Sequence, residues 1–301
     1  MKIVVTAAVS QIGYWVLRRA GEAEHQVFAG FHRRQFAAPV AQEIWTGIDL
    51  QHPAPGLTDG PMAGADVLIH CGPPQFAPNA ARLGAALKCR AVVAFGSTSA
   101  IYHDLPRPFG DPVRAAMLRR LEQEFLQACA NHRIAGTLFR PTMVYGAGMD
   151  GNVARLARMI ARSPLLPLPR QADGLRQPIH ADDIAALALT AASDPSFGGN
   201  GQCQVFDIAG GEQLPYRAMV RRIGEAIGRP PRLITVPGFE QVMHAASLIR
   251  PSLYPTVSAL YRMRLDQVAD NEPAERAFGF APRAFTPSAD ALLVPIHLLA
   301  G

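Results

Sequence analysis

The sequence predicts an α/β protein, in which a doubly wound parallel sheet is followed by a smaller, mostly helical C-terminal lobe. Two observations lead to this class. Along the first half of the chain, short runs of β-branched residues alternate with segments of helical period, as in successive βαβ units. Beyond about residue 150, proline and glycine become frequent and the strand-like runs become isolated. This change of pattern divides the chain into two parts.

The first half contains the expected strands and two expected helices. The helix over 11–20 follows the first strand, and the helix over 113–129 places Met117, Leu121 and Phe125 on one face. The strands are short, mostly apolar runs at 2–6, 26–31, 66–70, 91–95 and 136–139.

In the second half, Asp182 and Asp183 precede an apolar run over 184–192, where acids favour the start of a helix. We assign residues 1–165 to the sheet domain, to which 180–208 return. Residues 166–179 and 209–301 are assigned to the smaller lobe. The other elements expected here are strands at 205–208 and 232–236 and helices at 216–227 and 273–278.

Composition excludes several classes of protein. The chain has 301 residues, of which 49% are hydrophobic and 18% charged, and this excludes a disordered chain. The net charge is only +5 and no basic block or basic-aromatic stripe is present, so we expect no nucleic-acid partner. Of the 29 basic residues only Lys2 and Lys88 are lysines, and the rest are arginines.

The cysteines and the apolar runs bear on metal, membrane and compartment. Four cysteines lie at no metal-ligand spacing, so we expect no metal site and reduced thiols in a cytoplasmic compartment. The longest largely apolar stretch, 184–192, is interrupted only by Thr190 and is too short to span a bilayer, so no membrane partner is expected.

The turn after the first strand bears on cofactor binding. A dinucleotide pyrophosphate sits on a helix N-terminus, and its close approach to the backbone normally requires glycines at fixed spacing. Residues 6–13 read Thr-Ala-Ala-Val-Ser-Gln-Ile-Gly. This turn is similar to a Thr-Gly-x-x-Gly-x-x-Gly turn in which only Gly13 is kept, while Ala7 and Ser10 replace the other two glycines.

Further motifs follow in a matching order along the chain. With them, the sequence resembles the extended short-chain dehydrogenase/reductase family, also called the NAD-dependent epimerase/dehydratase family. The resemblance implies a Rossmann-type dinucleotide-binding domain and a smaller substrate-side lobe. The motifs are Asp-Leu at 49–50, Asp-Val-Leu-Ile-His-Cys-Gly at 66–72, Gly-Ser-Thr-Ser-Ala-Ile-Tyr at 96–102, Arg-Pro-Thr-Met-Val-Tyr-Gly-Ala-Gly at 140–148, Ile-His-Ala-Asp-Asp-Ile-Ala at 179–185 and Ala-Phe-Gly-Phe-Ala-Pro-Arg at 277–283.

The resemblance also implies a set of cofactor-binding positions. Because the second strand is followed by His32, Arg33 and Arg34 with no acid until Glu43, we expect NADP rather than NAD. The alternative is that these arginines are ordinary loop charges. The implied cofactor-binding residues are Thr6, Ala8, Ser10, Gln11, Ile12, Gly13, His32, Arg33, Arg34, Asp49, Leu50, Cys71, Gly72, Arg120 and Pro141.

The family's catalytic pair is missing from this chain. The family uses a Tyr-x-x-x-Lys pair, in which the phenol exchanges a proton with the substrate and the lysine lowers the phenol's pKa. Anchored on Glu124, the two positions fall on Ala116 and Arg120. Any other register leads to the same conclusion, because the chain has no lysine beyond Lys88 and no tyrosine between residues 102 and 145.

Other residues are candidates for the missing proton chemistry. The family's catalytic Ser/Thr position falls on Thr98, and Tyr102, His103 and Tyr145 are the candidate substitutes for the tyrosine. Structural alternatives stay open: Thr98 closes a strand, and Arg120 pairs in solvent with Glu124. Structural interpretations also stay open for four further residues. Cys71 would be a packing residue, His180 a structural histidine, and Asp182 and Asp183 helix caps.

Two classes of function remain. The first is an NADP-linked oxidoreductase or epimerase-type enzyme that acts on an unknown small molecule with a non-standard active site. The second is a non-catalytic dinucleotide sensor or scaffold protein. The 113–129 helix has enough apolar residues to form a homodimer in the way the family often does, although a monomer would have the same sequence features.

Overall fold

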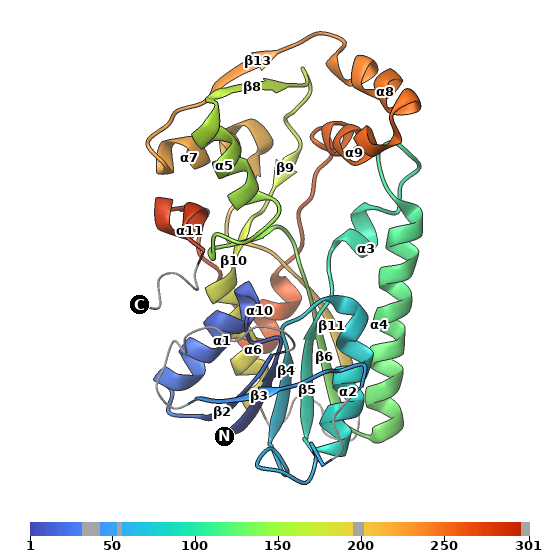
Figure 1. The fold of residues 1–301 in the computed structure, drawn as a ribbon, viewed down its shortest axis with the longest axis vertical. Coiled ribbons are helices and arrows are strands. Elements are labelled where there is room, and N and C mark those ends of the chain that lie inside the picture. Colours follow the sequence, from blue (N-terminus) through green and yellow to red (C-terminus); the bar gives the residue numbers. More distant parts are fainter. Residues whose placement is uncertain (32–42, 53–55, 195–201, 296–301) are drawn as a thin grey trace.

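The computed structural model describes residues 1–31, 43–52, 56–194 and 202–295 (Figure 1). Its centre is a parallel sheet of seven strands in the order β11-β6-β5-β4-β1-β2-β3. The strands are β1 (Lys2–Thr6), β2 (Gln26–Phe31), β3 (Glu43–Gly47), β4 (Val67–His70), β5 (Ala91–Phe95), β6 (Ala135–Pro141) and β11 (Cys203–Ile208).

Helices cover both faces of the sheet, as a doubly wound fold requires. On one face α1 (Gln11–Glu22), α6 (Ala181–Ser193) and α10 (Glu272–Phe278) pack over an apolar layer that includes Val5, Ile69 and Phe139. On the other face α2 (Ala77–Ala86) and α4 (Pro112–His132) pack over Leu68, Val92 and Leu138. The central strands are buried from both sides, which explains their continuous apolar sequences.

The smaller lobe has its own core, in which Tyr145, Ile160, Met219 and Phe285 are buried together. It lies above the carboxyl ends of the strands in Figure 1. Its helices are α5 (Val153–Arg162), α7 (Tyr216–Ala226), α8 (Phe239–Ile249), α9 (Tyr254–Arg262) and α11 (Ala289–Leu293). Its short sheets pair β7 (Val144–Tyr145) with β10 (Ile179–His180), β9 (Leu175–Arg176) with β12 (Leu214–Pro215), and β8 (Leu165–Leu168) with β13 (Arg232–Thr235).

The predicted fold class is confirmed, and the predicted elements are present with small differences in their ends. The elements that were not predicted include β3, α2 and α5, and the short strands β7, β8, β9, β10 and β12. A short helix, α3 (Ser99–Tyr102), and two 3₁₀ turns (Pro74–Phe76 and Pro251–Leu253) were also not predicted. In the part of the chain that the structure describes, no helix combines the length and the apolar character needed to cross a membrane.

Candidate functional site

The site lies at the carboxyl edge of the sheet, where β1 and β4 are neighbours. From β1 the chain continues outward through β2 to β3, and from β4 it continues in the opposite direction through β5 to β6. In open α/β sheets such a reversal leaves a crevice outside the strand ends, and ligands bind there.

The turn between β1 and α1 has alanine and serine, Ala7 and Ser10, where the family motif has glycines. Ala7 adopts the left-handed region with φ of 55°, a conformation that costs an alanine about 1 kcal/mol. Ser10 caps α1, because its side-chain oxygen accepts the N–H of Gly13 at 3.0 Å. A Cβ on Gly13 would lie 2.7 Å from the carbonyl oxygens of Ala7 and Ala8, so glycine is required there by the turn itself.

The start of α1 can accept an anion. Within the described residues, the backbone N–H groups of Gln11 and Ile12 have no acceptor, and the first turn of α1 contains no acid. Such a helix terminus attracts a negative group through its free donors and its dipole. The side-chain Oε1 of Gln11 is buried with no donor, so this residue also leaves an acceptor for a ligand.

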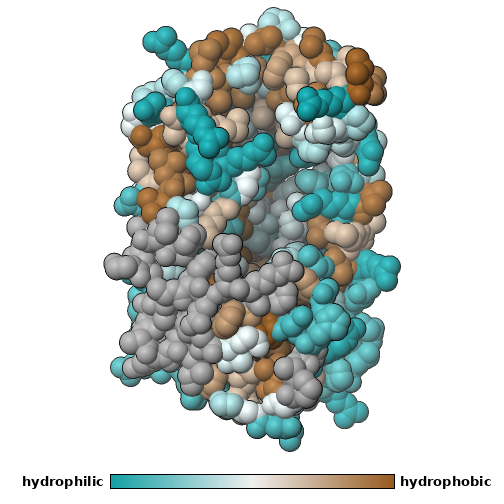
Figure 2. All heavy atoms as spheres, in the orientation of Figure 1, coloured by the Kyte–Doolittle hydropathy of each residue, from teal (hydrophilic) through white to brown (hydrophobic). Residues whose placement is uncertain are grey.

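A cavity of about 250 Å³ joins this helix start to the ends of three further strands. The hollow between the two lobes is visible in Figure 2. The cavity lies where the small lobe's segment 150–152 faces the sheet domain. It is lined by Gln11, Ile12, Gly72, Pro74, Phe95, Gly96, Ser97, Pro141, Thr142, Val144, Asp150, Gly151 and Asn152.

The structure brings together only some of the expected cofactor residues. Gln11, Ile12, Gly72 and Pro141 line the cavity. The others from the turn and from β4 are used within the protein: Thr6 hydrogen-bonds His70, Ala8 donates to Gly30, and Cys71 is buried. Asp49 and Leu50 follow β3 and do not line the cavity, and His32, Arg33 and Arg34 lie outside the described residues.

The assignment of Ala116 and Arg120 to the catalytic positions is wrong. Both residues are exposed, and the Arg120 guanidinium pairs with Glu124 one turn away at 2.8 Å. At 3.6 residues per turn, Arg120 lies about 200° around α4 from the buried Leu118. It therefore faces away from the sheet, and the structural interpretation, in which Arg120 pairs in solvent with Glu124, is the correct one.

The inward face of α4 offers no tyrosine and no lysine. Glu122 is buried and therefore lies on the inward face of α4. Leu118 stands one helical turn before it and Arg114 two turns before it, at the positions that correspond to the lysine and the tyrosine. The neighbouring inward pair is Ala115 and Arg119, whose guanidinium donates to the carbonyl of Ala100. In either register the tyrosine and lysine positions lack their usual groups, so proton transfer from α4 in the family's manner is absent.

We expect the substitution Arg120→Ala to leave dinucleotide affinity within about twofold and the free energy of unfolding within about 0.5 kcal/mol, because exposed i,i+4 pairs contribute little. Isothermal titration with NADPH and urea denaturation measure the two quantities. A tenfold loss of affinity for NADPH would contradict this prediction and would indicate that Arg120 contacts the cofactor.

A partly buried ionic network lies beside Gly96, which lines the cavity. Arg140 of β6 pairs with Glu122 at 2.9 Å and with Asp207 of β11 at 3.4 Å. Burial raises the pKa of Glu122 although Arg140 opposes this effect. Oε1 of Glu122 has no donor and faces Gly96, where an added Cβ would lie 2.8 Å from it. The network ties α4, β6 and β11 together beside the cavity.

None of the three candidate catalytic residues lines the cavity, and only Tyr102 has a partly exposed side chain. Thr98 is buried and donates its hydroxyl to the carbonyl of Pro141 at 3.2 Å. Tyr145 is buried in the core of the small lobe against Phe285, and its hydroxyl has no partner. Tyr102 ends α3 and is half-buried, and burial together with nearby Asp207 raises its pKa to about 12.

Sequence reasoning missed Ser97, Glu122 and Asp207. Ser97 lines the cavity, and its Oγ accepts the N–H of Ser99, which leaves the hydroxyl proton free. The run of three hydroxyl residues at 97–99 signalled a site here, but spacing alone did not show which of them faces the cavity. Asp207 carried no signal, because an acid near a strand end is usually exposed. Glu122 stands two residues before Glu124 on the same helix, and spacing alone did not show which of the two acids is buried.

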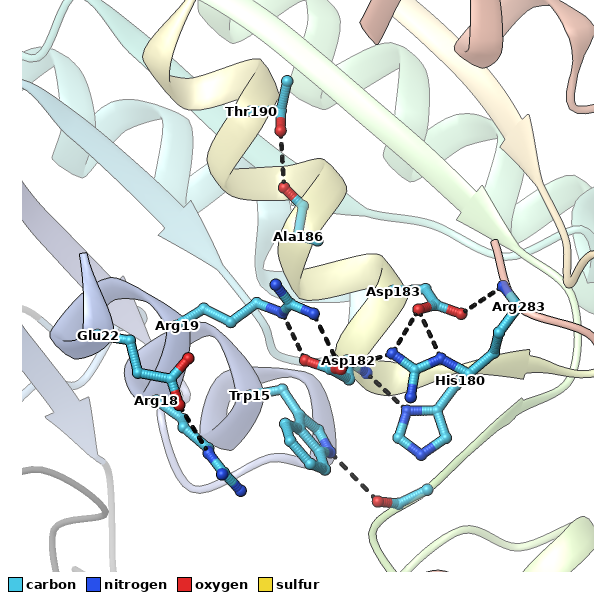
Figure 3. A network of polar contacts seen from close by, with 11 residues as sticks. Trp15, Arg18, Arg19, Glu22, His180, Asp182, Asp183, Ala186, Thr190 and Arg283 are labelled. Atoms are coloured by element: carbon cyan, nitrogen blue, oxygen red, sulfur yellow. Dashed lines mark hydrogen bonds and ion pairs between the residues drawn. The ribbon is translucent and has the colours of Figure 1, made fainter. Parts of the chain in front are cut away.

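A second network holds the start of α6 and lies apart from the cavity (Figure 3). Asp182 accepts two hydrogen bonds from Arg19 of α1 and one from Arg283, which also pairs with Asp183. His180 caps α6, because its Nδ1 accepts the N–H of Asp182 at 3.1 Å, and burial lowers its pKa to about 4. His180, Asp182 and Asp183 therefore have structural roles at the start of α6, which is the structural interpretation given for them in the sequence analysis.

The doubly wound parallel sheet with a crevice at its switch point defines an α/β protein of the Rossmann type. A family model confirms this class: the NAD dependent epimerase/dehydratase family matches residues 3–209. The chain belongs to that family.

Relatives and solved structures agree with the family. A 2-alkyl-3-oxoalkanoate reductase of Stenotrophomonas maltophilia (strain K279a) is 25% identical over 94% of this chain and 95% of its own length. A UDP-glucose 4-epimerase of Vibrio cholerae is 25% identical, but over only 38% of this chain and 34% of its own length. The solved structure described as MoeE5 in complex with UDP-glucuronic acid and NAD covers both chains fully, with a TM-score of 0.72 and 18% identity.

Proposed function

We propose that the protein is an NADP-linked oxidoreductase that reduces a carbonyl group of a small molecule. The observation that carries the proposal is the cavity that the start of α1 shares with the ends of β4, β5 and β6. It has free backbone donors at one end and the hydroxyl of Ser97 at the other. The full-length resemblance to a reductase supports the same reaction class.

The residues present fit a dinucleotide. Gln11 and Ile12 would hold the pyrophosphate with their backbone N–H groups, and the buried Oε1 of Gln11 would accept a donor of the cofactor. Gly72 and Pro141 would form the walls. When bound, the cofactor supplies a hydride. The preference for NADP is based on Arg33 and Arg34, whose guanidinium groups suit a 2′-phosphate.

The proton chemistry favours reduction over epimerisation. Reduction needs a group that donates a proton, whereas oxidation and epimerisation also need the same group as a base. With a pKa of about 12, the phenol of Tyr102 stays protonated at neutral pH and no lysine is near to lower this value. We therefore assign Tyr102 as the proton donor, with Ser97 as the hydroxyl that orients the carbonyl.

Titration with NADPH and NADH followed by an activity screen tests the proposal. We expect NADPH to bind about tenfold more tightly, which equals about 1.4 kcal/mol and suits one charge-assisted contact to a phosphate. A panel of ketones and 3-oxo acids should then oxidise NADPH, measured by absorbance. Tighter binding of NADH would contradict the cofactor preference.

The loss of proton chemistry on α4 also supports a second function, that of a dinucleotide sensor. Ala115 and Leu118 are buried on the inward face of α4, and neither side chain can exchange a proton. A sensor would bind NADPH with a saturating thermal shift and show no turnover across the panel. If millimolar NADPH gave no shift, both cofactor functions would be excluded and a scaffold role would remain.

A further inference from the structure

Cys129 and Cys203 lie together on the α4 side of the sheet, although they are far apart in the sequence. Cys129 is fully buried near the end of α4, and Cys203 is the partly exposed first residue of β11. Gly136 of β6 lies between them. A Cβ on Gly136 would be 2.9 Å from Sγ of Cys129 and 3.0 Å from Sγ of Cys203. Glycine at this position leaves the room that the two sulfur atoms occupy.

The two thiols differ in access and in acidity. Their sulfur atoms are hydrogen-bonded to each other, and the donation from Cys129, helped by the N–H of Gly136, lowers the pKa of Cys203 to about 7. The same contact, together with burial, raises the pKa of Cys129. The carbonyl of Leu126, at 3.5 Å from Sγ of Cys203, favours the protonated form. Cys203 is thus the partly exposed thiol that attacks first, and Cys129 is the buried thiol beside it.

We propose that Cys203 and Cys129 form an oxidation site at which a peroxide converts the two thiols into a disulfide between β11 and α4. The Cys203 thiolate attacks one oxygen of hydrogen peroxide, the O–O bond breaks, and a sulfenic acid and hydroxide are formed. The hydroxide takes up the proton that the Cys203 thiol lost on ionisation and becomes one water. The sulfur of Cys129 then attacks the sulfenic sulfur, the S–O bond breaks, and the Cys129 proton leaves with the hydroxyl as a second water. Two thiols and one peroxide give one disulfide and two waters.

The other two cysteines are poor alternatives. Cys71 is buried with the α1 and α6 side of the sheet, whereas Cys89, Cys129 and Cys203 lie on the α2 and α4 side. Burial raises the pKa of Cys89 to about 12 and also raises that of Cys71. Neither forms the thiolate that peroxide requires. The site links the same three elements as the Glu122–Arg140–Asp207 network but requires no particular reaction at the cavity.

Peroxide treatment of the full chain tests the proposal. With one equivalent of hydrogen peroxide, the number of thiols titrated in denaturant should fall from four to two. Non-reducing peptide mapping by mass spectrometry should join the Cys129 and Cys203 peptides. A thiol count that stays at four, a disulfide between other cysteines, or a linkage between two chains would overturn the proposal.

Variants separate the two steps. In Cys129→Ala, the oxidation should stop at the sulfenic acid, and dimedone should label Cys203. Cys89→Ala is the matched control for a buried cysteine, and it should still lose two of its three thiols. Dimedone labelling of Cys129 in Cys203→Ala at an equal rate would show that Cys203 is not the attacking thiol and would overturn the assignment.

Discussion

Replacing Asp182 by alanine is expected to lower the free energy of unfolding by about 2 kcal/mol. Asp182 has a side chain that is only 12% exposed and accepts hydrogen bonds from both Arg19 and Arg283. Its loss leaves two guanidinium groups without their shared carboxylate (Figure 3). The value is below that of a fully buried pair, because the two arginines are 36% and 40% exposed. Urea denaturation followed by circular dichroism measures the change.

Arg18→Ala is the matched control on the same helix. Arg18 also pairs with an acid, Glu22, but both side chains are about half exposed, so its removal should change the stability by less than about 0.5 kcal/mol. Equal losses for the two variants would show that the Asp182 network is no more stabilising than a surface pair.

The stabilisation from Asp182 depends on pH in a defined direction. Burial raises the pKa of this carboxyl, but the hydrogen bonds from Arg19 and Arg283 outweigh burial and hold the pKa below its usual value of 3.8. A carboxyl whose pKa is lower in the folded state stabilises the fold above its unfolded pKa, and this contribution is lost as the pH falls through the folded value. The difference between wild type and Asp182→Asn should therefore be constant near neutral pH and shrink below about pH 4.

Local sequence was sufficient for most of the sheet. The central strands β1, β4 and β5 are buried on both faces, so their apolar character is continuous and easy to recognise. Helix α2 was missed because Pro73, Pro74 and Pro78 indicate a break. Proline is nevertheless tolerated in the first turn of a helix, where its missing N–H has no partner in any case.

The register of α4 could not be predicted from spacing, because two acids compete as anchors. With Glu124 as the anchor the lysine position falls on Arg120, and with Glu122 as the anchor it falls on Leu118. The structure distinguishes them: Glu122 is buried against Arg140, whereas Glu124 pairs with the exposed Arg120. Arg140 lies on β6, so the decisive contact joins residues 18 positions apart and depends on tertiary packing. The absence of the Tyr-x-x-x-Lys pair could be predicted, because that prediction required only the positions of the lysines and tyrosines in the sequence.

The substitution with the largest expected effect on turnover is Tyr102→Phe. It removes only the hydroxyl that we assign as the proton donor, and general acid catalysis of this kind contributes about 10²-fold or more. We expect kcat for carbonyl reduction to fall about 100-fold while the Kd for NADPH stays unchanged, because Tyr102 is not among the residues that line the cavity. Steady-state kinetics and fluorescence titration separate the two parameters.

Tyr145→Phe provides the matched control, since it removes a tyrosine hydroxyl that is buried in the small lobe without a partner. It should leave kcat unchanged, and its fold should be as stable as the wild type or slightly more so. The wild-type rate should also be flat from about pH 6 to pH 9, because the pKa of Tyr102 is raised to about 12 and its protonated form persists throughout this range. A fall in rate with a pKa near 7, or an equal loss in both variants, would show that Tyr102 is not the proton donor. His103 would not explain such a fall, because burial and the nearby Arg262 and Arg114 lower its pKa to about 4.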